Sequence, residues 1–132
     1  MKPAALAASL IAAALLLSGC SLTSVAGGDE ITIVAGESRD GMFFEPSAIT
    51  VPPGARVTFV IKNEGSQDHE FESNQEGEAG IGEIIIPPGG TRRVNWTAPS
   101  EAATFPFYCD LPGHRAAGME GTLKVVPDSE ER

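Results

Sequence analysis

Basic residues are scarce in this chain, in which nine lysines and arginines stand against 18 aspartates and glutamates, for a formal net charge of −9. Binding to nucleic acid or to anionic lipid through a basic patch is therefore disfavoured. Cysteine and histidine are scarcer still, with two of each. A chain of 132 residues also leaves no room for a second full domain beside one hydrophobic core.

A helical hydrophobic period is also missing after the N-terminal stretch, and period-two alternation takes its place. Two similar turns, at residues 51–57 and 86–94, each join an apolar strand end to an apolar restart through Pro-Pro-Gly. These patterns predict an all-β sandwich. The residues expected to point inward are Ile31, Ile33, Ile49, Val51, Val57, Phe59, Ile61, Val94, Trp96, Phe105, Phe107, Leu123 and Val125.

One short segment, residues 109–119, carries a thiol, an imidazole and a thioether in Cys109, His114 and Met119. Cys109 continues the inward parity of the strand before it, which should deliver its thiol toward the interior. Four residues separate each donor from the next, and the Pro and Gly among them allow the bends needed to curl around one ion. A soft thiolate and thioether select copper, and imidazole suits both of its oxidation states. Together with His69, these donors are the ligand set of a blue-copper electron-transfer site.

The order of these motifs resembles that of the small cupredoxins, the superfamily of plastocyanin and azurin. The resemblance covers residues 31–126, and residues 42–51, 63–69 and 107–123 carry it. It implies a Greek-key β-sandwich of two sheets and about seven to eight strands, with a copper site at one end.

By this resemblance, His69, Cys109 and His114 form the trigonal plane around one copper ion that cycles between Cu(I) and Cu(II), and Met119 is the weak axial ligand. Each donor alone would more often have a structural role, and only the set in this order favours copper. Zinc could also occupy the site in vitro. Met42, in contrast, is expected to pack in the core.

The N-terminus predicts export. Lys2 and an apolar stretch through Leu17 form a short signal peptide, too brief for a standard membrane span. Residues 17–20, Leu-Ser-Gly-Cys, resemble a bacterial lipobox, which implies cleavage before Cys20 and a diacylglyceryl group, usually with a third acyl chain, on that cysteine. The alternatives are an uncleaved anchor or an ordinary secretory cleavage nearby. The expected location is a bacterial membrane, with the lipid-anchored domain facing the periplasm or the cell surface.

These assignments divide the chain into four parts. They are a signal peptide at 1–19, a lipidated cysteine and flexible tether at 20–30, a cupredoxin domain at 31–127, and a polar C-terminal tail at 128–132. With Cys20 lipidated and Cys109 on copper, no thiol remains for a disulfide.

The expected partners are redox proteins, and the chain itself is expected to be a monomer. In the family that this chain resembles, apolar residues ring the partner-facing edge of the second histidine; here they would be Leu111, Pro112, Ala116 and Ala117. A small apolar contact suits the quick release of weak redox encounters. Arg115 departs from this pattern and would bias the choice of partner.

Acidic residues also cluster in a stretch that contains no lysine or arginine. They form either a solvated loop or a docking patch for a partner with a basic surface. They are Glu64, Asp68, Glu70, Glu72, Glu76, Glu78 and Glu83.

Two positions depart from the family pattern. The family often has Asn after the first histidine and a hydroxyl after the cysteine, and these side chains tie the two loops together; here the residues are Glu70 and Asp110. Two ionised carboxylates cannot donate that hydrogen bond. Either the tie is replaced or one carboxylate is protonated, and negative charge there would favour Cu(II) and lower the reduction potential.

The function that fits all four donors is that of a membrane-tethered one-electron carrier between redox partners outside the cytoplasm. The alternative is a protein of extracytoplasmic copper delivery, storage or resistance, although such a protein usually offers more exposed Met or His. A copper oxidase or nitrite reductase needs further histidines for a catalytic centre, so no enzyme is expected.

Overall fold

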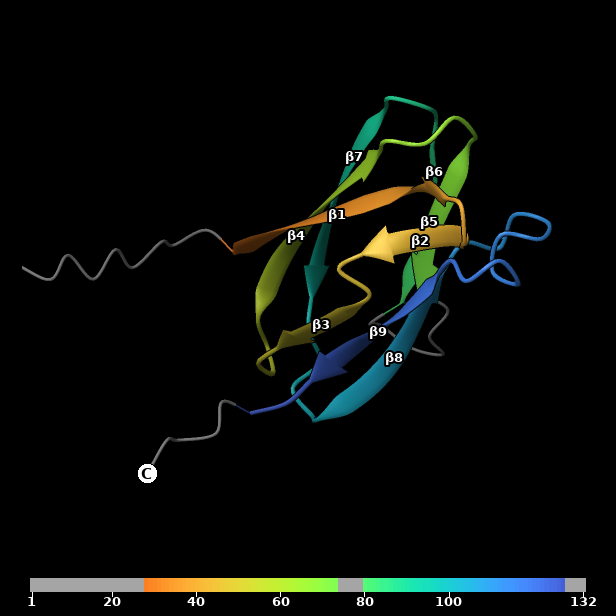
Figure 1. The fold of residues 1–132 in the computed structure, drawn as a ribbon. Coiled ribbons are helices and arrows are strands. Elements are labelled where there is room, and N and C mark those ends of the chain that lie inside the picture. The colour runs from red at the N-terminus through yellow and green to blue at the C-terminus, as the bar shows by residue number, and fades with distance from the viewer. Residues whose placement is uncertain (1–27, 74–79, 128–132) are drawn as a thin grey trace, which may run out of the picture.

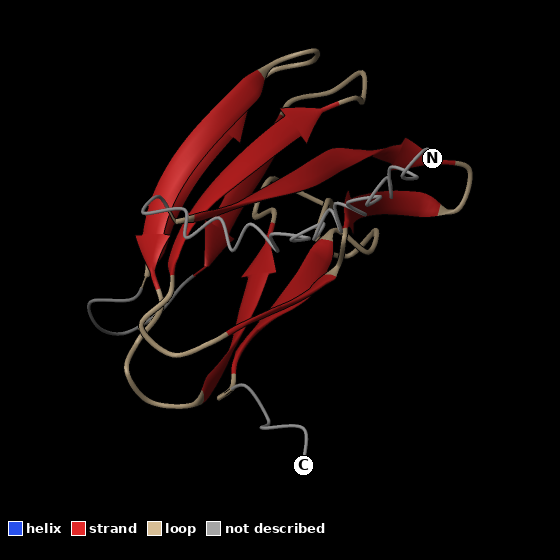
Figure 2. Cartoon of the chain, turned by 90° about the vertical axis from the view of Figure 1, so that its left-hand side faces the viewer, coloured by secondary structure: helices blue, strands red, loops and turns tan. Residues whose placement is uncertain are grey.

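The computed structural model describes residues 28–73 and 80–127, which form two β-sheets packed face to face (Figure 1). The predictions for the signal peptide, Cys20, most of the tether, Glu76, Glu78 and the C-terminal tail fall outside these residues. No helix is present in the described ranges, whose regular structure consists of strands alone (Figure 2). Accordingly, this part of the chain has no helix long and apolar enough to cross a membrane.

Nine strands make up the sandwich in residues 28–73 and 80–127. They are β1 (Asp29–Ser38), β2 (Gly41–Glu45), β3 (Ala48–Val51), β4 (Arg56–Asn63), β5 (His69–Ser73), β6 (Ile81–Ile86), β7 (Thr91–Thr97), β8 (Ala103–Tyr108) and β9 (Glu120–Val125). One sheet has the order β2-β1-β4-β7 and the other has the order β3-β9-β8-β5-β6. The pairs β1–β4 and β3–β9 are parallel, and the remaining pairs are antiparallel. The expectation of an all-β, two-sheet sandwich is thus confirmed.

The number of strands exceeds the seven to eight expected because residues 42–51 contribute to two strands that lie in different sheets. Strands β2 and β3 follow one another in the chain, yet β2 pairs with β1 in the first sheet and β3 pairs with β9 in the second. Pro46 lies between them and has no N–H to continue a ladder. Residues 42–51 therefore supply an edge strand to each sheet.

The first strand begins before the expected domain boundary at residue 31. Asp29 and Glu30, which the sequence assigned to the tether, align with Val57 and Thr58 of β4 in a parallel pair. The Glu30 carboxylate also forms an ion pair with Arg93. These two residues belong to the sheet because backbone pairing begins before Ile31, the first apolar residue of the strand. Hydrophobic periodicity gives no signal for polar residues such as these.

The core lies between the two sheets and contains the inward residues that alternation predicted. Of these, Ile31, Val94 and Phe105 are partly buried against the core, and the others are buried within it. Sequence patterns missed Phe44 and Phe71, whose rings contact each other and Phe107 at centroid distances of 5.3–5.6 Å.

The position of the aromatic cluster explains how the core reaches the predicted ligands. Phe71 comes two residues after His69 on β5, and Phe107 comes two residues before Cys109, at the end of β8. Because side chains alternate along a strand, the side of each strand that fills the core also presents a donor at the strand end. The aromatic part of the core therefore lies next to these donors.

Candidate metal centre

Three donor side chains, from two segments far apart in the sequence, meet at one end of the sandwich. The Nδ1 atoms of His69 and His114 lie 3.3 Å apart, and Cys109 Sγ lies 3.4 Å from His114 Nδ1. In the described part of the chain, these are the three residues whose ligand atoms lie within 4.8 Å of one another. His69 and Cys109 are fully buried, whereas His114 keeps 8% of its surface exposed. One edge of the cluster thus reaches solvent.

The loop after β8 holds its donors through backbone hydrogen bonds. The Cys109 N–H donates to the Met119 carbonyl and the Met119 N–H donates to the His114 carbonyl, both at 3.1 Å. Gly113 and Gly118 take positive φ values of 84° and 104°, which L side chains rarely adopt. The Met119 side chain is fully buried. The bends expected from the glycines therefore place Met119 directly against the backbone of the other two donors.

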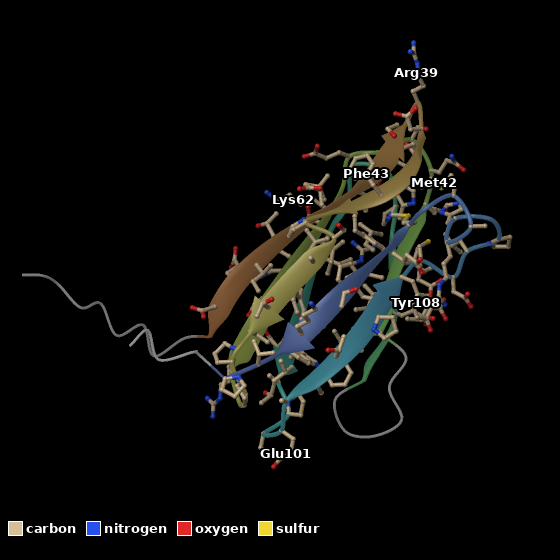
Figure 3. All side chains as sticks on the ribbon, turned by 60° about the horizontal axis from the view of Figure 1, so that its bottom comes forward. Arg39, Met42, Phe43, Lys62, Glu101 and Tyr108 are labelled. Atoms are coloured by element: carbon tan, nitrogen blue, oxygen red, sulfur yellow. The ribbon has the colours of Figure 1, made fainter. Side chains whose placement is uncertain are left out.

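The hairpin formed by β1 and β2 is hydrogen-bonded to this loop at Ala117. The Met42 N–H donates to the Ala117 carbonyl at 2.9 Å. Gly41 has a φ of 145°, and a Cβ at this position would lie 2.3 Å from the same carbonyl oxygen. Met42 is partly buried against the core, and Figure 3 shows it on β2 beside the loop. The requirement for glycine at position 41 was not apparent from the sequence, because it arises from contact with a distant segment.

The His69 ring lies beside a carboxylate that the sequence analysis did not single out. His69 Nε2 lies 3.1 Å from Glu37 Oε1, although the N–H is not well aligned with that oxygen. Burial lowers the pKa of His69, and the Glu37 charge opposes this shift. Hydrogen bonding from the Ser66 N–H is the main cause that lowers the pKa of Glu37. A neutral imidazole beside an ionised carboxylate is the form that binds a metal through its other nitrogen.

The thiol of Cys109 is a shielded donor. Burial raises its pKa, and hydrogen bonds from the backbone N–H groups of Leu111 and Glu70 act in the opposite direction. The Glu70 N–H lies 3.3 Å from the sulfur. Without a metal, such a thiol keeps its proton and is unreactive; a soft metal would take the place of that proton.

The spacing of the donors fits one metal ion. Imidazole and thiolate ligands about 2.0–2.3 Å from an ion would lie roughly 3.5 Å from one another in a trigonal plane. The observed separations of 3.3 and 3.4 Å agree with this arrangement. Two imidazoles, a thiolate and a nearby thioether suit copper in both oxidation states.

Comparison with known proteins supports the same assignment. The cupredoxin-like domain family matches residues 8–125. This chain is a cupredoxin. Both of its histidines lie in the one donor cluster.

Its relatives have names that indicate different roles. The copper-resistant cuproprotein CopI of Pseudomonas aeruginosa is 30% identical over 74% of this chain and 76% of its own length. Plastocyanin of Prochlorothrix hollandica is 30% identical over 88% of this chain and 85% of its own length. Among solved structures, reduced auracyanin of Roseiflexus castenholzii superposes with a TM-score of 0.64 at 26% identity, over 76% of this cupredoxin and 99% of auracyanin.

The two carboxylates beside the site differ in their surroundings. Glu70 is 5% exposed and Asp110 is exposed. Burial, followed by the charges of Glu72 and Glu83, raises the pKa of Glu70 to about 7. A side-chain hydrogen bond with Glu72 acts in the same direction. The Glu70 carboxyl is therefore mostly protonated below neutral pH, and the backbone contact from Glu70 to the Cys109 sulfur links the two loops.

The residues expected to ring the edge of His114 belong to the same loop as that histidine. Pro112 and Ala116 are exposed, whereas Leu111 and Ala117 are half-buried. Arg115 has its guanidinium 4.1 Å from the centroid of the Tyr108 ring and 3.0 Å from a Glu120 oxygen. Its guanidinium is therefore held by Tyr108 and Glu120.

Proposed function

We propose that this cupredoxin is a one-electron carrier that works outside the cytoplasm. The observation that carries the proposal is the closed donor cluster, in which only the edge of His114 reaches the surface. Copper bound there would supply the change of oxidation state. The protein residues exclude water, hold the donors in one arrangement and leave one imidazole edge for electron exchange.

A second function, copper delivery, storage or resistance, is favoured by the similarity to CopI. Such a protein must release its metal. The burial of His69, Cys109 and Met119 argues against rapid release, because a competing chelator has access only along the His114 edge. The electron-carrier function therefore remains the first choice.

Redox cycling in the presence of a chelator separates these functions. We expect the Cu(II)-loaded domain to show an intense thiolate-to-copper band that ascorbate bleaches and ferricyanide restores over repeated cycles. With excess bathocuproine, an electron carrier should retain its copper and recover the band. A band that is lost within one cycle, together with the Cu(I)–bathocuproine colour, would instead identify a copper-delivery protein.

We also propose that the chain is a lipoprotein whose redox partners meet it at a bacterial membrane. The lipobox-like residues 17–20 support this proposal. At the docking surface, the apolar ring of Leu111, Pro112, Ala116 and Ala117 would contact the partner. The acidic residues between positions 64 and 83 would favour a partner with a basic surface.

Cys20→Ser is expected to move the protein from the membrane fraction to the soluble or secreted fraction of a bacterial host, because the acceptor of the lipid is lost. Incorporation of labelled palmitate by the parent chain, and its loss in the variant, is the measurement. A variant that stays in the membrane without label would indicate an uncleaved anchor. A parent that is secreted without label would indicate ordinary secretory cleavage.

A further inference from the structure

The carboxylate of Glu37 joins the first sheet to the loop that carries His69. Glu37 lies near the end of β1, and its Oε2 accepts a hydrogen bond from the Ser66 N–H at 2.8 Å. Its Oε1 accepts a second from the Gln67 N–H at 3.1 Å and lies 3.1 Å from His69 Nε2. One side chain therefore contacts the loop and the ring of a copper ligand together.

The surrounding chain is shaped to admit this carboxylate. A Cβ added to Gly65 would lie 2.5–2.7 Å from the Glu37 carboxylate atoms, so a larger residue there would displace the carboxylate from this position. On the other side of the loop, the buried Asn63 side chain accepts from the Gly65 N–H at 2.8 Å and donates to the Gln67 carbonyl at 2.7 Å. It also donates to the Ile86 carbonyl at 2.8 Å. The loop is thus fixed from two sides just before His69.

The geometry also determines which nitrogen of His69 faces the other donors. Nδ1 points to His114, whereas the buried Nε2 lies 3.1 Å from Glu37 Oε1, although its N–H is not well aligned with that oxygen. If Nε2 carries the proton, Nδ1 keeps a lone pair for a metal. A carboxylate on the outer nitrogen selects this tautomer and makes the imidazole a stronger donor.

We propose that Glu37 is a positioning residue of the copper centre, which fixes the Nε2–H tautomer of His69 and shifts the copper couple toward Cu(II). The inference rests on the copper site of the proposed function. It goes further because it makes β1, a strand that supplies no ligand, partly responsible for the reduction potential. Negative charge on the outer side of an imidazole ligand stabilises the more highly charged metal ion.

The first test uses NMR of the metal-free protein, and its result does not depend on electron transfer. The long-range nitrogen–proton couplings of His69 should show a proton on Nε2 in the parent. In Glu37→Ala, which removes the acceptor, we expect a mixture of tautomers. A parent that carries its His69 proton on Nδ1 would overturn the proposal, even if the protein carries electrons.

The second test compares reduction potentials of the copper-loaded parent and Glu37→Gln at one neutral pH. Glutamine keeps an oxygen acceptor but loses the charge, so we expect the ratio of Cu(II) to Cu(I) affinities to fall about tenfold, a rise of about 59 mV for a one-electron couple. Glu30→Gln is the matched control, because it removes the same charge from the other end of β1, where the carboxylate pairs with Arg93. Its potential should stay near that of the parent.

The remaining outcomes are distinguishable. Lower thermal stability in Glu37→Gln with an unchanged potential would show that Glu37 only braces the loop, and would overturn the proposed tuning. Equal shifts in Glu37→Gln and Glu30→Gln would reduce the effect to net charge and would also overturn it. Absence of a reversible band in the parent would refute the electron-carrier function. The NMR measurement of the His69 tautomer would then be the one test of the role of Glu37.

Discussion

Replacement of Cys109 by serine should abolish essentially all of the intense visible absorption of the copper-loaded protein. That band requires a thiolate on the metal, and a hydroxyl supplies no equivalent donor at neutral pH. Serine is of similar size and can accept the hydrogen bond that the Glu70 N–H now gives to the sulfur. The fold should therefore persist, as far-ultraviolet circular dichroism would show, while the absorption spectrum at equal Cu(II) loading loses its band.

The second cysteine of the chain provides the control. In a chain that begins at residue 20, Cys20→Ser removes a thiol of the same kind but should leave the band unchanged. If Cys109→Ser kept the parent spectrum and Cys20→Ser lost it, the thiolate ligand would have been assigned to the wrong residue.

Substitution of Glu70 by glutamine should raise the free energy of unfolding at pH 8 by on the order of 2 kcal/mol. The ordinary carboxyl pKa of 4.5 rises to about 7 in the folded protein, chiefly through burial. Below about pH 4.5 the group is protonated in both the folded and unfolded states, so its favourable contribution is fully present. As pH rises through 7, the folded state must ionise a buried group beside like charges, and that contribution is lost.

Urea unfolding of the metal-free protein between pH 4.5 and pH 8 would measure this effect, because metal binding would otherwise add its own stabilisation. Glutamine resembles the protonated form, so parent and variant should agree at the acidic end and diverge toward pH 8. Glu101→Gln is the matched control, since Glu101 is exposed and lies at the opposite end of β8 from the donor cluster (Figure 3). A difference between parent and Glu70→Gln that does not depend on pH would contradict the assigned cause.

The donor set could be predicted because most of it is local. Cys109, His114 and Met119 share one loop, and their spacing is readable without any knowledge of the fold. His69 followed because it is the other histidine in the chain. The inward direction of Cys109 followed from strand alternation, and the structure confirms it by burying the side chain completely.

Features that depend on contacts between distant segments could not be predicted in this way. Glu37 lies 29 positions before Ser66, and nothing in the pattern around either residue indicates that they meet. The buried ring of Phe44 follows Phe43 in an apolar run without clear alternation, so its parity was ambiguous. The early start of β1 depends on its parallel pairing with β4, which leaves no periodic signal in polar residues such as Asp29.

The separation of the two imidazoles along the chain has a mechanical consequence. His69 and His114 are 45 positions apart, so a bound ion would close a long loop between β5 and the segment after β8. By the chain-entropy argument used for covalent cross-links, a tie of this length restricts the unfolded chain by roughly 4 kcal/mol. The one cysteine in the described ranges is free, so the metal would act there as a cross-link that a chelator can remove.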